Sequence, residues 1–325
     1  MKKYLIFATL VAMVFVGCKK NTTAPPKPVD KRVVAKFSGN ILKGDVTTTT
    51  ITRVSERGEW EAKDQIGVFM FANEKERNAD NVLKSNVLHK YTSTVSLTTA
   101  DGAKTVNNAV FEPAFEDAIY FPAKTKVDFV AYFPYIKDMS PTAKTIKADF
   151  SNPDKMALET EGFYWAEAIG QSEESPKVTF TFKRAHGAMT LELSSETKDV
   201  NAMDLEDAKF TLIGVPTIGS FDIMTGKIFF RTDVTQPKEV EFTQRRINLP
   251  PHTNEKYGDR RIEISFSANP RVYHVPLKVD IEAGMSHRIA VKFQDDIRAS
   301  VETSIVKWDL ESVPRINVPM EINKE

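Results

Sequence analysis

The residue with the clearest potential chemistry is Cys18, the only cysteine among the 325 residues. A basic tip, an apolar run over 4–16 and Gly17 precede it. The run is too short to span a bilayer and has the layout of a secretory signal. A small residue directly before a cysteine is typical of a lipoprotein cleavage site. We therefore expect residues 1–17 to be a signal peptide and Cys18 an acylated N-terminus; a buried thiol or an uncleaved anchor is the alternative.

Side chains that could catalyse a reaction or bind a metal ion are scattered along the chain. No two histidines have the four-residue spacing of a helical metal pair, and no glycine-rich phosphate loop is present. The formal net charge is zero, which does not favour a nucleic-acid partner. The sequence therefore predicts no enzyme, no cofactor and no metal site. The five histidines are His89, His186, His252, His274 and His287.

Two further residue types allow a functional and a structural interpretation. Asp64 could act as an acid or base, but a lone carboxylate has no partner to set its pKa, so a hydrogen bond in a turn or at a strand edge is favoured. Trp60, Trp165 and Trp308 could stack on sugars. Because aromatic residues dominate the cores of β-sandwiches, core packing is the favoured interpretation.

The dominant apolar period from Val33 onward is two residues, which indicates strands. Val33, Ala35, Phe37 and Ile41 share one face of the first strand. No segment shows a sustained apolar stripe with the helical period, and 73–86 is expected to be a loop or a short helix. The pattern predicts an all-β fold. The other expected strands are 66–71, 118–121, 127–133, 178–182, 189–193, 208–213, 227–230, 262–266, 272–279 and 286–293.

Composition suggests how the mature chain is divided. Residues 18–32 are polar and rich in proline, which is typical of an extended tether. The remaining length fits about two domains. We expect an N-terminal domain over 33–175 and a C-terminal domain over 176–325, with the polar loop at 170–177 as the boundary and 194–207 as the second candidate.

Four blocks in sequence order resemble the fimbrillins. The block from Trp60 to Met70 resembles W-x-x-G-D-x-I-G-V, with Lys63 in place of the first glycine. Residues 127–135 resemble the strand DF-x-AYYPY. Phe182, His186 and the following 189–193 resemble F-x-H-x-x-x-x-L-x-L. Residues 283–308, which end at Trp308, resemble the closing G-x-x-Y-x-(I/V)-x-L … I-x-x-W pattern.

The resemblance implies the fold and the assembly of a type V pilus subunit. It implies two transthyretin-like β-sandwich domains, export as a lipoprotein, and cleavage after an arginine by a trypsin-like, Arg-specific protease. Cleavage would release the first strand, and the opened groove would accept a strand from a neighbouring subunit. By position, the cleavage site is expected at Arg53, with Arg57 as the alternative and Arg32 a distant third.

The C-terminal tail has the pattern that such a donor strand requires. Ile316, Val318, Met320 and Ile322 alternate with polar residues or proline. An alternating peptide can complete a sheet with its backbone and fill successive pockets with its side chains. We expect the donor to enter where Val33, Ala35, Phe37 and Ile41 are displaced, in a groove lined by 66–71. The tail is equally consistent with an ordinary last strand of its own domain.

These inferences leave two functions from different classes. The first is a structural pilin, as a stalk, anchor or tip subunit, that travels through the outer membrane as a lipoprotein, matures to a cell-surface fimbrium and contributes to cell adhesion. Its partners would be other pilus subunits and the protease. The alternative is an outer-membrane lipoprotein that binds a surface ligand such as a glycan and never polymerises.

Overall fold

The computed structural model describes residues 32–41, 60–98, 105–114, 117–139, 144–153, 162–198, 200–230, 235–253, 259–295, 298–307 and 316–319. Almost all regular structure in these ranges is β-strand, and a short helix, α2 (Ala202–Glu206), lies among the strands. No helix in these ranges is long and apolar enough to cross a bilayer. The predicted all-β fold class is confirmed.

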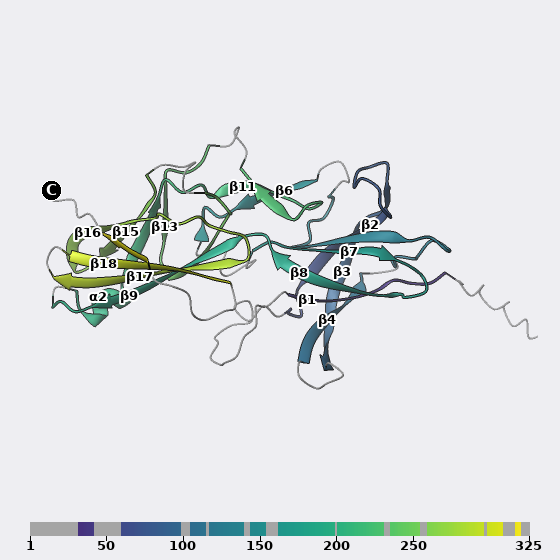
Figure 1. Ribbon diagram of the computed structural model, residues 1–325, viewed down its shortest axis with the longest axis horizontal. Coiled ribbons are helices and arrows are strands. Elements are labelled where there is room, and N and C mark those ends of the chain that lie inside the picture. The colour runs from purple at the N-terminus through teal and green to yellow at the C-terminus, as the bar shows by residue number, and fades with distance from the viewer. Residues whose placement is uncertain are drawn as a thin grey trace, which may run out of the picture. The chain divides into compact units, whose positions relative to one another are not determined.

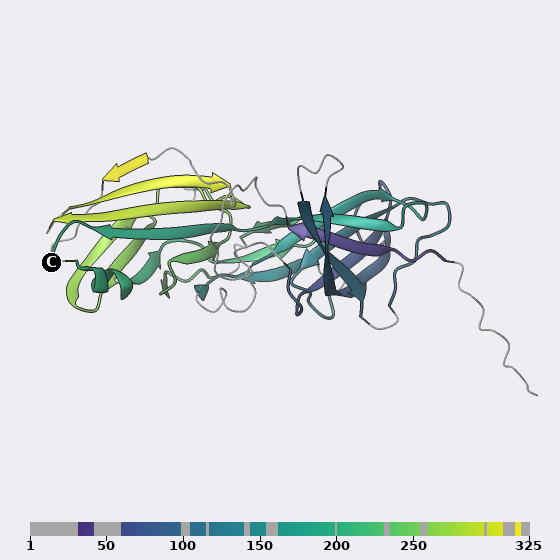
Figure 2. The same ribbon diagram turned by 90° about the horizontal axis from the view of Figure 1, so that it is seen from below.

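The first group of strands closes into a barrel. Figure 1 and Figure 2 show these strands from two directions. The barrel has the order β1-β4-β3-β2-β5-β7-β8, and β1 completes the closure because it pairs with β4 on one side and with β8 on the other. The strands are β1 (Lys36–Ile41), β2 (Gln65–Ala72), β3 (Val82–Thr98), β4 (Thr105–Pro113), β5 (Val127–Phe133), β7 (Tyr164–Gln171) and β8 (Lys177–Arg184).

Two barrel strands are buried on both faces, which explains their continuous apolar sequences. Ile66 and Val68 of β2 face the barrel core, whereas Phe69 and Phe71 of the same strand belong to a second core outside it. β5 divides its side chains in the same way. The second core is covered by a three-stranded sheet in the order β12-β11-β6, made of β6 (Thr145–Asp149), β11 (Ile218–Asp222) and β12 (Lys227–Phe229).

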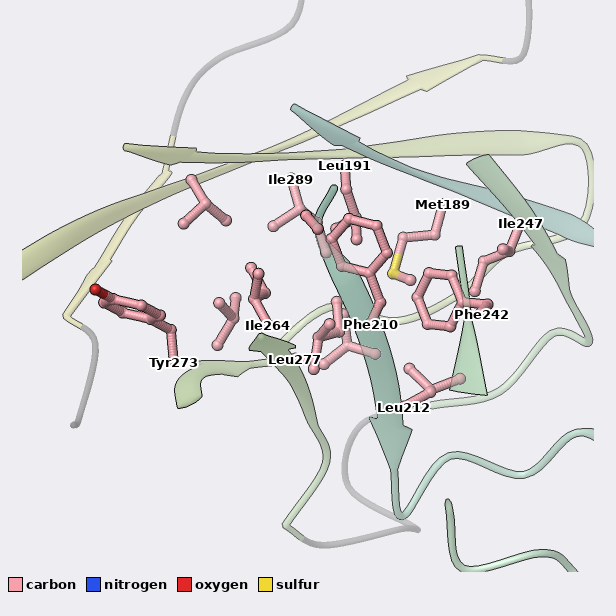
Figure 3. Close-up of a cluster of buried hydrophobic side chains, with 14 of the residues drawn as sticks. Met189, Leu191, Phe210, Leu212, Phe242, Ile247, Ile264, Tyr273, Leu277 and Ile289 are labelled. Atoms are coloured by element: carbon pink, nitrogen blue, oxygen red, sulfur yellow. The ribbon is translucent and has the colours of Figure 1, made fainter. Parts of the chain in front are cut away.

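Two further sheets enclose a third core, part of which Figure 3 shows. Met189 and Ile289 reach into it from one sheet, and Phe210 and Ile264 from the other. The first sheet has the order β14-β9-β17-β18-β19, with β9 (Gly187–Ser195), β14 (Arg246–Leu249), β17 (Met285–Asp295), β18 (Arg298–Lys307) and β19 (Ile316–Pro319). The second has the order β13-β10-β15-β16, with β10 (Lys209–Ile213), β13 (Glu239–Phe242), β15 (Arg261–Phe266) and β16 (Asn269–Pro276).

The chain does not pass from the barrel to the next sheet at the expected domain boundary between 175 and 176. β8 follows that point and still pairs with β1 and β7 of the barrel, so the change of sheet comes between β8 and β9. β6 lies before that point and pairs with β11, which lies after it. The first group also closes as a barrel instead of leaving two separate sheets. The transthyretin-like layout and the domain limits therefore stay predictions.

Two local expectations differ from the structure. The segment 73–86 contains turns only as far as 81, and β3 begins at Val82. The expected strand at 118–121 is instead an extended segment with a single bridge between Tyr120 and Val34.

Candidate functional site at strand β1

Strand β1 alternates between buried and exposed positions as its sequence predicts. Ala35, Phe37 and Ile41 are 4%, 2% and 6% exposed and belong to the barrel core. Val33 is partly buried and packs against the same core. All four residues of the predicted face therefore lie in or against one core, while Lys36 between them is exposed.

The backbone of β1 is held by two neighbours of opposite direction. Along β8 it runs parallel, with all six residues from Lys36 to Ile41 in register. Along β4 it runs antiparallel, and only Phe37, Ser38 and Gly39 pair. We call the edges of β4 and β8 with the core residues beneath them the β1 seat. Without β1 these edges would be unpaired, as at any open sheet edge.

Aromatic rings form the floor of the seat. Phe37 stacks on Phe180 of β8, with the ring centroids 5.5 Å apart and the planes at 13°. It also meets Phe129 of β5 edge-on at 5.1 Å and His89 of β3 edge-on at 4.9 Å. Burial lowers the pKa of His89 to about 4, despite the contact of its Nδ1 with the Val87 carbonyl oxygen. His89 is therefore neutral at pH 7 and packs as an aromatic ring.

The segment before β1 is fixed to the loop that precedes β5. The Ala35 N–H donates to the Ile119 carbonyl at 2.9 Å, and the Phe121 N–H donates to the Val33 carbonyl at 2.9 Å. The Arg32 guanidinium lies 4.1 Å from the centre of the Tyr120 ring. This geometry is a cation–π contact.

The expected groove lining needs one correction. The strand expected to line it, 66–71, is β2, whose described strand neighbours are β3 and β5, not β1. Its inward residues Ile66, Val68 and Met70 share the barrel core with Phe37, but β2 itself pairs with β3 and β5 and not with β1. Sequence reasoning missed the role of β8, whose Val178, Phe180 and Phe182 are fully buried in strict alternation.

The structure places Trp60 and Trp165 in cores and thus confirms the core-packing interpretation for both. Trp60 is 8% exposed and meets Phe182 at 4.8 Å and Phe111 at 5.1 Å, both edge-on. The Trp165 Nε1–H donates to the Ile223 carbonyl at 2.9 Å. Trp308 lies outside the described residues.

Asp64 makes the turn contact that its sequence position predicts. Its Oδ2 accepts a hydrogen bond from the Glu61 N–H at 2.7 Å, and its carbonyl accepts one from the Tyr91 N–H at 3.1 Å. Burial raises the pKa of Asp64 to about 6, and the Glu61 N–H partly offsets this shift. No group of three metal-binding side chains forms in the part of the chain that the structure describes.

The described part of the tail pairs with a strand of the same chain. β19 pairs antiparallel with β18, with Ile316 opposite Thr303 and Val318 opposite Val301. It forms the edge of that five-stranded sheet. Met320 and Ile322 lie outside the described residues, as do Cys18, Arg53 and Arg57. The lipidation, processing and donor roles of these residues therefore stay predictions.

Comparison with known proteins identifies the family. A family model described as fimbrillin-like matches residues 52–308, more than half of the chain. The chain belongs to the fimbrillin-like family. This family is made of structural and adhesion proteins rather than enzymes, so the expected non-enzymatic class is confirmed and a place at the cell surface follows. No curated protein matches the fimbrillin-like chain in sequence.

Two solved structures share the fold of the fimbrillin-like chain. A candidate cell adhesion protein from Bacteroides uniformis is 18% identical with a TM-score of 0.65, and the match covers 87% of this chain and 100% of that one. A candidate cell adhesion protein from Bacteroides ovatus is 19% identical with a TM-score of 0.63, covering 86% and 99%. At these identities the similarity shows the fold alone.

Proposed function

We propose that this fimbrillin-like chain is a pilus subunit that is exported as an outer-membrane lipoprotein and assembled by protease-triggered strand exchange at the β1 seat. The observation that carries the proposal is the position of β1. Among the described strands it pairs only with β4 and β8, and it closes the barrel. A cut beyond β1 leaves the strand held by backbone hydrogen bonds and side-chain burial alone.

The chain connection supports this order of events. β1 ends at Ile41, and the next described residue is Trp60 in the barrel core. The intervening segment contains both expected cleavage sites, Arg53 and Arg57. A cut there would detach a piece running from Cys18 through β1, so release from the lipid anchor and opening of the seat would be one event.

The incoming strand would take over the backbone hydrogen bonds and the core contacts that β1 makes. Its backbone would pair with β4 and β8, and its alternate side chains would enter the barrel core. The alternating tail with Ile316, Val318, Met320 and Ile322 is the segment that this chain would donate to the next subunit. Ile316 and Val318 sit on an edge strand, and within the described residues the pairing of β19 with β18 spans four residues, so few of the described backbone hydrogen bonds oppose its removal.

Processing variants test the proposal in the producing cells. Arg53→Lys keeps the positive charge but removes an Arg-specific cleavage site, and Arg57→Lys is the matched control. We expect Arg53→Lys to hold the chain in the membrane fraction and to abolish filaments recognised by an antibody to this chain. Cys18→Ala should leave an unlipidated precursor. Release and filaments that persist in the Arg53→Lys, Arg57→Lys double variant would contradict the proposal and favour a surface lipoprotein that does not polymerise.

A further inference from the structure

Among the inward positions of β1, Gly39 leaves the least room for a side chain. A methyl group built at Gly39 would stand 2.8 Å from Cε2 of Phe182 and 3.2 Å from the Phe180 carbonyl oxygen. The first distance is shorter than carbon atoms approach in folded proteins, so the Phe182 ring would have to move. That ring is fully buried and packs against Trp60 at 4.8 Å, which restricts its movement.

The seat therefore selects a pattern of side-chain sizes. The four inward positions of the native strand hold alanine, phenylalanine, glycine and isoleucine at Ala35, Phe37, Gly39 and Ile41. The large ring at the second position fills the space among Phe129, Phe180 and His89. The third position has no room for a side chain. A competing strand must therefore place a large side chain at the position of Phe37 and a glycine at the position of Gly39.

The tail of this chain does not offer that pattern. The apolar residues that alternate along the tail are Ile316, Val318, Met320 and Ile322, and they include neither glycine nor alanine. Every register that places at least three of these residues in the four inward positions puts a valine, methionine or isoleucine against Phe182. Reversing the direction of the tail changes nothing, because all four residues are large. The other face of the tail, Asn317, Pro319 and Glu321, is unsuited to an apolar core.

We infer that the β1 seat takes its strand from a different subunit and not from a second copy of this chain. The strand that it selects carries a glycine at the position crowded by the Phe182 ring, which pairs with Phe180, and a large apolar residue two positions earlier. The inference rests on the proposed strand exchange and adds the identity of the partner. Copies of a chain whose tail cannot enter the β1 seat of another copy do not form a homopolymer. This subunit therefore assembles only with unlike neighbours.

Peptide exchange into the full chain tests the inference. The chain is cut with an Arg-specific protease and then incubated with fluorescently labelled peptides, whose uptake is followed by fluorescence anisotropy. One peptide has the native sequence 33–41, and one has the tail sequence 314–325. Two variants of the native peptide carry Gly39→Leu at the buried position or Lys36→Leu at the exposed position.

We expect the native and Lys36→Leu peptides to enter, and the Gly39→Leu and tail peptides to bind at least about tenfold more weakly, because overpacking a core is costly. Tail peptides with Val318→Gly, Met320→Gly or Ile322→Gly should recover uptake in one register. Tail binding equal to that of the native peptide would overturn the heterotypic partner while leaving strand exchange in place. If the native peptide itself fails to enter, both strand exchange and the inference are wrong.

Discussion

Phe37 of β1 stacks on Phe180 of β8, although its backbone partner on that strand is Val178. The backbone partner of Phe180 is Gly39, which has no side chain to cover the aromatic ring. The Phe37 ring therefore covers a neighbour two residues along the parallel strand. This diagonal contact links Phe37, which carries the large side chain, to Gly39, which carries none. A strand that replaces β1 must therefore present a large residue and then a glycine in this order.

Removing the Phe37 ring should weaken the hold of β1 on the barrel. Phe37→Ala deletes a ring that is 2% exposed, and we expect the free energy of unfolding to fall by about 3–5 kcal/mol. Urea unfolding of the uncut chain measures this change. Lys36→Ala, at the exposed position beside it, is the control and should change stability by less than about 0.5 kcal/mol. Equal effects of the two variants would contradict the described face of β1.

Trp60 should prove to be a core residue in solution. Its ring lies against Phe111 and Phe182, which are both buried in the barrel. Trp60→Ala should lower the free energy of unfolding by about 3–5 kcal/mol, and Trp60→Phe by clearly less because an aromatic ring remains. Fluorescence quenching by acrylamide should barely reach Trp60 in the folded chain. A loss below about 1 kcal/mol for Trp60→Ala would revive its interpretation as a sugar-stacking residue.

Much of the fold could be predicted because strand periodicity is a local signal. The alternation at 178–182 and the apolar run at 127–133 each predict a strand, and both lie within strands that the structure describes. The first strand face was also predictable, because Ala35, Phe37 and Ile41 alternate with polar residues. These patterns require no knowledge of which strands become neighbours.

The neighbours of each strand depend on contacts between distant residues and could not be predicted. Nothing local in β1 or β8 shows that they pair in parallel across about 140 residues of sequence, as Ser38 and Thr179 do in hydroxyl contact at 3.2 Å. The β6–β11 pairing likewise joins segments on opposite sides of the expected boundary. The polar strand β3 was missed because its exposed residues lack a continuous apolar face.

The neighbours of Gly67 explain why this position near the end of the Trp60 block is a glycine. A methyl group at this position of β2 would lie 2.2 Å from Cε1 of Tyr132 and 2.8 Å from Oδ1 of Asn86. The Tyr132 hydroxyl donates to that same Asn86 oxygen at 2.7 Å, so the ring cannot move without losing its partner. Gly67→Ala should therefore cost about 1–3 kcal/mol of stability, measured by urea unfolding.

A matched variant separates this crowding from the general effect of replacing a glycine. Tyr132→Phe shortens the side chain and removes its hydroxyl, which frees the ring to shift. In the Tyr132→Phe background, Gly67→Ala should cost less than it does in the native chain. Identical costs in the two backgrounds would show that the Tyr132 contact does not restrict Gly67.

Stability should fall as the pH is lowered from about 6.5 to about 4. Burial lowers the pKa of His89, His252 and His287 from 6.5 to about 4 each, and that of His186 to about 3. In this window the unfolded chain binds protons that the folded chain excludes, so each histidine stabilises the fold above its unfolded pKa and loses that contribution as the pH falls. Asp64 has the opposite sign, because its raised pKa favours the fold at low pH and that contribution is lost as the pH rises through about 6.

The histidines outnumber Asp64, so their sign should prevail, and His89 offers the cleanest test. His89→Phe keeps an aromatic ring beside Phe37 but removes the site that is protonated on unfolding. The slope of the free energy of unfolding against pH between 6.5 and 4 should decrease by up to about 1.4 kcal/mol per pH unit. Urea unfolding at pH 6.5, 5.5 and 4.5 measures the slope, with Thr92→Ala on the exposed part of β3 as the control. An unchanged slope in His89→Phe would mean that His89 is protonated equally in the folded and unfolded chains, and that its burial against Phe37 does not persist in solution.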